Sequence, residues 1–542
     1  MNSKYRAEDI FDYVIVGAGA AGAVLANRLS ADPAVTVCLI EAGGRNTSPW
    51  LHIPAGFIKV IKNPKWTWQF QAQTAGRMIA YPQGRTLGRT TAINGMIYNR
   101  GQAQDFDDWA RMGNRGWSYQ DVLPYFRRSE NFSGPSSPQF HGRGGPLNVS
   151  AATWRHPICD AFIAAAAQSG IPENPDYNGA QQAGAGYFQR TIGSRFRSST
   201  SNAFLRPISR RGNLSIRTHA VCSAVLFEGR VAQGVRYFVD GDCNRPVTIR
   251  ARREVILSAG AINTPRLLEI SGVGDAEHLA RIGAPLVHHL PGVGGNLGDH
   301  YSVRVVARVR NSLTINEMTR GGRLLKEVLR WIAGRPNLLA VSPSIVHWFG
   351  FSRPGMDRAD LQGVFTPASY REGAIGRLDG FPGMTAGVWA HRPLSRGHTH
   401  ARSIDPNEAP EIVANYLVHP EDQSVLASGI RQARALLRHP ALQNYFDDEV
   451  LPGGGVETDA DILAFAGRYG MSAQHLSGTA RMGLSANPLA VVDAELRVHG
   501  LDRLRVVDAS VMPTGPSANT AAATMMIAEK AADMILGRPA AA

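Results

Sequence analysis

The chain has few cysteines, and none of them is placed to bind a metal ion. Its 542 residues include only Cys38, Cys159, Cys222 and Cys243. No two of them form a Cys-x-x-Cys pair or another spacing suited to zinc, so we expect no metal site. Isolated cysteines are typical of a reducing compartment, where we expect these four to be buried thiols.

The sequence also lacks recognisable signals for export or membrane insertion. Residues 1–10 are polar and lead directly into an expected strand, without the apolar core of a secretory signal. No uninterrupted apolar stretch approaches the length of a membrane span. These absences predict a cytoplasmic protein that makes at most peripheral contact with a membrane.

Lysine is scarce, although the formal net charge is +13. Lysine occurs only at positions 4, 59, 62, 65, 326 and 530, and the arginines are scattered along the chain. A nucleic-acid interface would concentrate basic and aromatic residues on one surface, and no such cluster is apparent. We therefore expect no nucleic-acid partner. With 44% hydrophobic residues, the chain is long enough to fold into more than one domain.

The N-terminal segment has the pattern of a dinucleotide-binding unit. The β-forming residues 11–16 are followed by Gly17, Gly19 and Gly22 and then by an apolar helical pattern. Gly17 permits the tight turn, and Gly19 lets the backbone approach a pyrophosphate. Gly22 lets the helix pack closely on the strand. The phosphates would then meet the free N–H groups at the start of the helix.

A second expected strand, residues 35–40, ends at Glu41. This carboxylate lies at the distance expected of the group that binds the ribose hydroxyls of a dinucleotide. It would repel a 2′-phosphate and so counts against NADP. These residues alone leave FAD and NAD as alternatives.

Four further blocks carry a family resemblance. They are residues 84–101, residues 258–274, residues 291–300, and residues 506–510 together with 519–520. In this order they resemble the signature blocks of the glucose-methanol-choline (GMC) family of flavin oxidoreductases, which implies FAD as the cofactor. Residues 99–128 look most like the choline dehydrogenase and the alcohol and sugar dehydrogenase branch.

The resemblance implies a mixed α/β fold (α+β) with two domains. We expect a Rossmann-like FAD-binding domain from residues 1–150, 200–300 and 478–542. The inserted substrate domain, residues 151–199 and 301–477, would be built on an antiparallel sheet with helices. Strand-like patterns at 214–216, 221–227, 231–239 and 248–257 suit the sheet of the FAD-binding part.

The resemblance also implies cofactor contacts beyond the three glycines and Glu41. These are Ala20, Ala21, Ala42, Leu87, Gly88, Arg89, Thr90, Asn94, Gly95, Met96, Val221, Ala259, Gly260, Asp508, Ala509, Asn519 and Thr520. Ile93 lies where some members carry a histidine bonded covalently to the flavin. Isoleucine has no nucleophile, so we expect non-covalent FAD.

One position departs from the family pattern. The chain has Gly88-Arg89-Thr90-Thr91 where the family usually carries a Gly-Gly-Ser-Ser type turn. If the backbone there requires a positive φ, Arg89 is strained by about 1 kcal/mol or more. Alternatively, Arg89 binds phosphate oxygens or closes the flavin channel.

Two residues match the catalytic positions of the family. His475 matches the catalytic histidine, and Asn519 matches a position that is histidine or asparagine in different members. With an ordinary pKa of about 6.5, a histidine accepts a proton at neutral pH. Asn519 stays neutral, could orient an alkoxide, and is expected to cap a helix over 521–536. His300 is expected to be a structural residue near the domain junction.

These residues predict oxidation of a small-molecule alcohol to an aldehyde or ketone, with hydride transfer to flavin N5 and His475 as the base. A dehydrogenase that uses a quinone or dye as electron acceptor is favoured over an oxidase that uses oxygen. A lyase with a passive flavin is the alternative of another class. The sequence does not identify the alcohol.

An amphipathic pattern at 323–333 has two interpretations. Its apolar side could lie on an anionic membrane, where a quinone would be found. The interpretation that we favour is a helix that packs this side onto the substrate domain.

Overall fold

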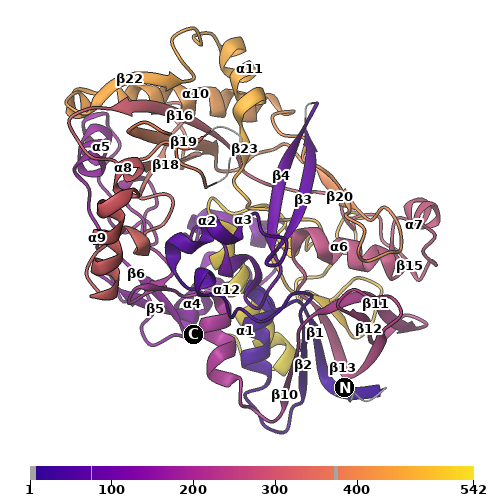
Figure 1. Cartoon of the computed structure of the whole chain (residues 1–542). Coiled ribbons are helices and arrows are strands. Elements are labelled where there is room, and N and C mark those ends of the chain that lie inside the picture. Colours follow the sequence, from indigo (N-terminus) through magenta and orange to yellow (C-terminus); the bar gives the residue numbers. More distant parts are fainter. Residues whose placement is uncertain (1–7, 75, 372–375, 542) are drawn as a thin grey trace.

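The computed structural model describes residues 8–74, 76–371 and 376–541, which form two large sheets with helices around them (Figure 1). This mixed α/β architecture confirms the predicted fold class. Two separate hydrophobic cores are centred on the two sheets.

The first sheet contains the expected dinucleotide-binding strands. Its order is β10-β2-β1-β13-β12-β11, and β24 also pairs with β13. The members are β1 (Glu8–Val16), β2 (Val37–Ile40), β10 (Leu214–Arg217), β11 (Ala220–Glu228), β12 (Val231–Val239), β13 (Pro246–Leu257) and β24 (Leu504–Val506). Strands β10, β2, β1, β13 and β24 run parallel, whereas β12 and β11 are antiparallel. All four strands expected between residues 214 and 257 are present.

Three helices begin near the ends of these strands. They are α1 (Ala20–Leu29), α6 (Gly260–Ile270) and α12 (Thr520–Leu536). Helix α1 packs against α12, although nearly 500 residues separate them in the sequence (Figure 1). Residues 13–16 of the central strand β1 are buried on both faces, which explains why they form a continuous apolar run.

The second sheet is antiparallel, with the order β22-β16-β19-β18-β17-β7, and β23 also pairs with β16. Helices α5 (Pro157–Gln168) and α10 (Pro420–Leu437) pack against it. Its strands are β7 (Gly184–Tyr187), β16 (Tyr301–Val309), β17 (Val346–Gly350), β18 (Leu361–Thr366), β19 (Gly383–Ala390), β22 (Phe446–Leu451) and β23 (Met471–Ser472).

Smaller elements complete the described part of the chain. The strands are β3 (Thr67–Thr74), β4 (Arg77–Gly84), β5 (Glu130–Ser133), β6 (Leu147–Ser150), β8 (Ile192–Gly193), β9 (Phe196–Arg197), β14 (Val273–Gly274), β15 (His288–His289), β20 (His398–His400) and β21 (Glu411–Val413). The helices are α2 (Phe57–Val60), α3 (Ala103–Arg111), α4 (Tyr119–Ser129), α7 (Ala276–Ile282), α8 (Ile315–Met318), α9 (Gly321–Ile332) and α11 (Asp459–Tyr469).

Helix α9 corrects one expectation. Leu325, Leu329 and Ile332 are 58–59% exposed, and Glu327 is the buried residue of this helix. The apolar side is therefore not packed onto the second sheet, and α9 lies at the edge of the molecule (Figure 1). Within the described residues, no helix combines the length and apolar character needed to cross a membrane.

The cysteines also differ in part from expectation. Cys38 and Cys159 are buried, but Cys222 is half-buried and Cys243 is exposed. All four are free thiols in the structure. The expectation of burial is therefore wrong for Cys243, which follows the end of β12 in a surface turn.

Candidate active site

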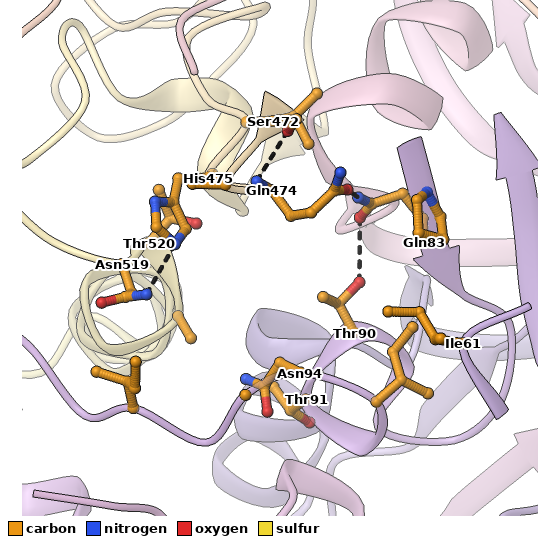
Figure 2. A pocket seen from close by; sticks show the side chains of 18 of the residues that line it. Ile61, Gln83, Thr90, Thr91, Asn94, Ser472, Gln474, His475, Asn519 and Thr520 are labelled. Atoms are coloured by element: carbon orange, nitrogen blue, oxygen red, sulfur yellow. Dashed lines mark hydrogen bonds between the residues drawn. The ribbon is translucent and has the colours of Figure 1, made fainter. Parts of the chain in front are cut away.

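A cavity of about 390 Å³ lies between the two sheets. The glycine turn and α6 line it from the first sheet, and strands β16, β18 and β19 line it from the second. Figure 2 shows His475 and Asn519 on one side, with Thr90 and Asn94 across from them. A smaller cavity adjoins it between β2, β11 and α6.

Most of the residues expected to bind the cofactor line these two cavities. The larger cavity is lined by Gly19, Ala20, Ala21, Arg89, Thr90, Asn94, Gly95, Met96, Ala259, Gly260, Asp508, Ala509, Asn519 and Thr520. The smaller one is lined by Gly17, Glu41, Ala42 and Val221, and also by Arg89 and Ala259.

Gly22, Leu87 and Gly88 line neither cavity. A Cβ on Gly22 would lie 1.8 Å from the Gly17 carbonyl oxygen, so Gly22 serves the close packing of α1 on the turn. Gly88 has a φ of +88° and donates its N–H to the Ala18 carbonyl at 2.8 Å. Gly22 and Gly88 therefore have a role in the packing of the turns, and the cofactor contacts expected of all three residues stay a prediction.

Glu41 is 1% exposed and closes the glycine turn. One carboxylate oxygen accepts the Ala18 N–H at 3.0 Å, and the other accepts the Gly43 N–H at 2.9 Å. The negative charge therefore lies at the end of β2, where backbone donors hold it in position.

Arg89 lies across the same turn. Its φ is +43°, so the strain predicted for a positive φ applies to it. A Cβ on Gly17 would be 2.9 Å from Arg89 Nη1, and one on Gly19 would be 3.2 Å from Arg89 Cδ. Arg89 Nε lies 4.0 Å from a carboxylate oxygen of Glu41. Its side chain therefore occupies the place where the two cavities meet.

Buried polar atoms without hydrogen-bond partners test whether the cavities fit FAD. Among the described residues they include Trp68 Nε1, Ser258 Oγ and Asn263 Oδ1, which border the cavities. Unpaired groups of this kind are rare in protein interiors unless a ligand or water completes them. Donors and acceptors beside a glycine turn and a helix start fit an adenine dinucleotide.

His475 lies in the larger cavity and is 8% exposed. Asn519 Nδ2 donates a hydrogen bond to His475 Nε2 at 2.7 Å (Figure 2). Asn519 is the N-cap residue of α12 as expected, but its side chain makes no capping hydrogen bond. The expectation that this side chain caps the helix is wrong, because it points to the histidine instead.

His300 sets the protonation of His475. His300 Nε2 lies 2.8 Å from the His391 carbonyl oxygen, which can only accept, so Nε2 carries the proton. His300 Nδ1 therefore accepts, and His475 Nδ1, 2.8 Å away, donates to it. The lone pair of His475 is left on Nε2, which faces Asn519 and the cavity.

Both imidazoles are neutral at neutral pH. Burial lowers the pKa of His300 to about 4. Burial, and secondarily the neighbouring His300, holds the pKa of His475 well below its usual range. A neutral imidazole can act as a base without first losing a proton.

Asp299 holds the two histidines in place. Its Oδ1 accepts the backbone N–H groups of His475 at 2.7 Å and of His300 at 2.9 Å. Its Oδ2 accepts the Ser472 hydroxyl at 2.5 Å and the hydroxyls of Tyr81 and Tyr416. Burial raises the pKa of this carboxyl group, and the donors around it oppose that rise.

The contacts of Asp299 and His300 with His475 were not predicted. His300 was expected to be structural, and it hydrogen-bonds directly to the expected catalytic histidine. The available signal was the adjacency of Asp299 and His300 within the block 291–300. The two histidines lie 175 positions apart in the sequence, so no local pattern pairs them.

Residues 11–302 and 393–528 match the two sequence profiles of the GMC oxidoreductase family. The chain therefore belongs to this family. It is an FAD-dependent oxidoreductase of the choline and alcohol dehydrogenase type. These matches confirm the predicted family, enzyme class and cofactor.

Similar proteins cover almost the whole chain. It is 38% identical over 535 residues to the "oxygen-dependent choline dehydrogenase" of Photobacterium profundum, covering 97% of this chain and 93% of that protein. It is also 38% identical over 535 residues to the "alcohol dehydrogenase (acceptor)" of Pseudomonas putida, covering 97% and 96%. Pyridoxine 4-oxidase from Mesorbium loti has a similar structure, with a TM-score of 0.87 at 27% identity over 98% of this chain and 100% of that one.

Proposed function

We propose that the chain oxidises a small alcohol to an aldehyde or ketone, with His475 taking the hydroxyl proton. The observation that carries this proposal is the lone pair of His475 Nε2, which the hydrogen bonds from His391 through His300 direct into the cavity. FAD, when bound, supplies at N5 the acceptor for the hydride of the alcohol carbon. The alternatives with oxygen as acceptor, or with a passive flavin in a lyase, are separated by experiment below.

Each polar residue around His475 has a role in the proposed proton transfer. Asn519 occupies the lone pair of His475 until the substrate hydroxyl replaces it. Its Nδ2 can then donate to the alkoxide that develops as the proton leaves. His300 keeps the other nitrogen of His475 protonated, and Asp299 fixes the backbone of both. The proton therefore has one destination, Nε2 of His475.

Anaerobic addition of alcohols to the FAD-loaded enzyme tests the proposal. Oxidation of the alcohol lowers the flavin absorbance at about 450 nm, because the flavin becomes reduced. An aldehyde or ketone must form in equal amount. Turnover of a substrate without bleaching would instead support the lyase, in which the flavin takes no electrons.

We propose a quinone as the electron acceptor, reached from a membrane surface. The exposed leucines of α9 lie beside exposed Arg323 and Lys326, which fits an anionic lipid surface. Helix α9 packs on the 3₁₀ turn Leu338–Ala340, which contacts the turn Pro54–Gly56 before α2. Phe57 of α2 lines the cavity. The apolar surface therefore lies near one wall of the site.

Two measurements test the acceptor. Reduced enzyme mixed with a soluble quinone should reoxidise much faster than reduced enzyme mixed with oxygen; faster reoxidation by oxygen would establish an oxidase. Vesicles that contain phosphatidylglycerol should bind the enzyme, whereas the double variant Leu325→Ser, Leu329→Ser should not bind. Binding to uncharged vesicles alone would contradict the role of the basic residues.

We further propose that FAD is bound non-covalently and that Arg89 pairs with its pyrophosphate. Ile93, which lines the cavity, offers no nucleophile for a covalent bond. Arg89 and the neighbouring Arg266 are mostly buried, and Glu41, the carboxylate that lies near Arg89 among the described residues, already accepts two backbone N–H groups. Denaturation should release all of the flavin into the supernatant; flavin retained on the denatured chain would contradict the first part.

A further inference from the structure

The substrate side of the cavity contains a cation, Arg304, that no carboxylate of the described residues neutralises. Arg304 and Ser302 are two residues apart on β16, so both side chains face the cavity. In the register of the sheet Arg304 lies opposite Gly387, which has no side chain to fill the space. The guanidinium lies 5.2 Å from the ring centre of Tyr370. Among the described residues it has no hydrogen bond or ion pair with another side chain.

On the walls formed by β16 and β19, Arg304 and Trp389 supply donors that have no partner among the described residues. Burial lowers the pKa of Arg304, but a guanidinium begins so high that it remains cationic at neutral pH. Trp389, which is 4% exposed, also lines the cavity, and its indole N–H has no partner. The hydroxyls of Thr366 and Thr385 are already donated to backbone carbonyl groups. A ligand that completes this site must bring acceptors.

Negative charge is scarce on the same walls. Among the described residues that line the cavity, Asp508 is the only carboxylate. It is 3% exposed, and it accepts hydrogen bonds from the backbone of Gly260 and the hydroxyl of Thr264. It therefore holds the start of α6 and offers no charge to a substrate. A quaternary ammonium would meet the Arg304 cation, and no other described residue that lines the cavity offers a free carboxylate to compensate.

We propose that the substrate is an alcohol that carries a carboxylate, and that Arg304 binds the carboxylate while the hydroxyl group lies at His475. A quaternary ammonium alcohol is a poor substrate, although relatives of this chain are named for choline. The inference rests on the proposed oxidation of an alcohol. It adds that the substrate carries a negative charge, because β16 and β19 present a cation and an unpaired N–H donor to the cavity.

Three benzyl alcohols that share the ring and the reacting hydroxyl group test the proposal on the FAD-loaded enzyme. They carry a para carboxylate, a para methyl group or a para trimethylammonium group. In anaerobic flavin reduction we expect kcat/KM to be about tenfold or more higher for the carboxylate than for the methyl compound, and lowest for the ammonium. Equal or faster reduction by the ammonium compound would overturn the proposal.

Variants assign the preference to Arg304. Arg304→Gln should lose the preference, so that the carboxylate and methyl compounds reduce the flavin with similar kcat/KM. Arg308→Gln is the matched control, because Arg308 is exposed on the same strand outside the cavity and the charge change is the same. An equal loss for all three compounds in Arg304→Gln would show a structural role instead and would overturn the proposal.

A binding measurement separates this inference from the proposed function. 4-Methylbenzoate cannot be oxidised at an alcohol group, but its carboxylate can still bind to Arg304 and perturb the flavin spectrum. If no alcohol reduces the flavin, the proposed oxidation fails. Tighter binding of 4-methylbenzoate to the unmodified enzyme than to Arg304→Gln would then still support the anion site, and equal binding would overturn it.

Discussion

The two ends of the cofactor cavity are built differently. At the base end, His475, His300 and Asp299 find their hydrogen-bond partners within the chain. At the glycine turn, Arg89 and Arg266 are mostly buried cations without a closely paired carboxylate among the described residues. Burial, with a smaller contribution from Arg89, lowers the pKa of Arg266 to about 10. The first end holds its histidines through partners in the chain, and we propose that the second end binds an anion.

Because of this difference, the rate of flavin reduction and the affinity for FAD should depend on different residues. The base end is preorganised, so its geometry should not depend on FAD. The other end, at the glycine turn, holds two cations. A negative group bound there would offset the free-energy cost of burying them. Substitutions at one end should therefore change flavin reduction, and substitutions at the other should change FAD binding.

The largest expected effect is at His475. His475→Ala removes the base and should lower the rate of alcohol-driven flavin reduction by about a hundredfold or more. The affinity for FAD should be unchanged, because the hydrogen bonds of His475 are made to other residues of the chain. Stopped-flow reduction and FAD titration measure the two quantities, and His398→Ala, outside both cavities, is the control. Unchanged reduction kinetics would remove His475 from the mechanism.

Asn519 should have the next largest effect. Asn519→Ala removes the donor that we expect to orient the alkoxide, and flavin reduction should slow by about tenfold to a hundredfold. Because the side chain makes no capping hydrogen bond, the melting temperature should change little. A large fall in melting temperature with normal reduction would show that Asn519 acts as a helix cap after all.

Arg89 tests the opposite end. Arg89→Gly should weaken FAD binding by about tenfold and flatten its dependence on salt concentration, because one charge-assisted contact is lost. Glycine also tolerates the positive φ, so the FAD-free protein should melt no lower than the unmodified one. Arg143→Gly, at an exposed position, controls for the loss of charge. Tighter FAD binding in Arg89→Gly would show that Arg89 obstructs the channel.

Features that depend on adjacent residues could be predicted from the sequence, whereas features that depend on contacts between distant segments could not. The strand, glycine turn and helix around Gly17 follow from adjacent residues, and the structure places them together. Arg304 was not identified, because its direction depends on the register of β16 beside β19. The exposure of Leu325 was not predicted either, since an amphipathic pattern is the same on a packed helix and on an unpacked one.

The smallest expected effect concerns the pH dependence of stability, and it follows from the completed base end. The pKa of His300 is about 4 in the folded protein, against 6.5 for an ordinary histidine. Between these values the unfolded chain binds a proton that the folded chain does not, so stability falls as the pH falls. His300 alone should cost about 1 kcal/mol between about pH 7 and 5.5, with no further loss below its folded pKa. Glutamine can donate and accept at the same positions, so His300→Gln should lose less stability over this range in denaturant titrations. An identical pH dependence in both proteins would show that folding does not lower the pKa of His300, which would remove the support for a neutral His300 as the acceptor of the His475 Nδ1 proton.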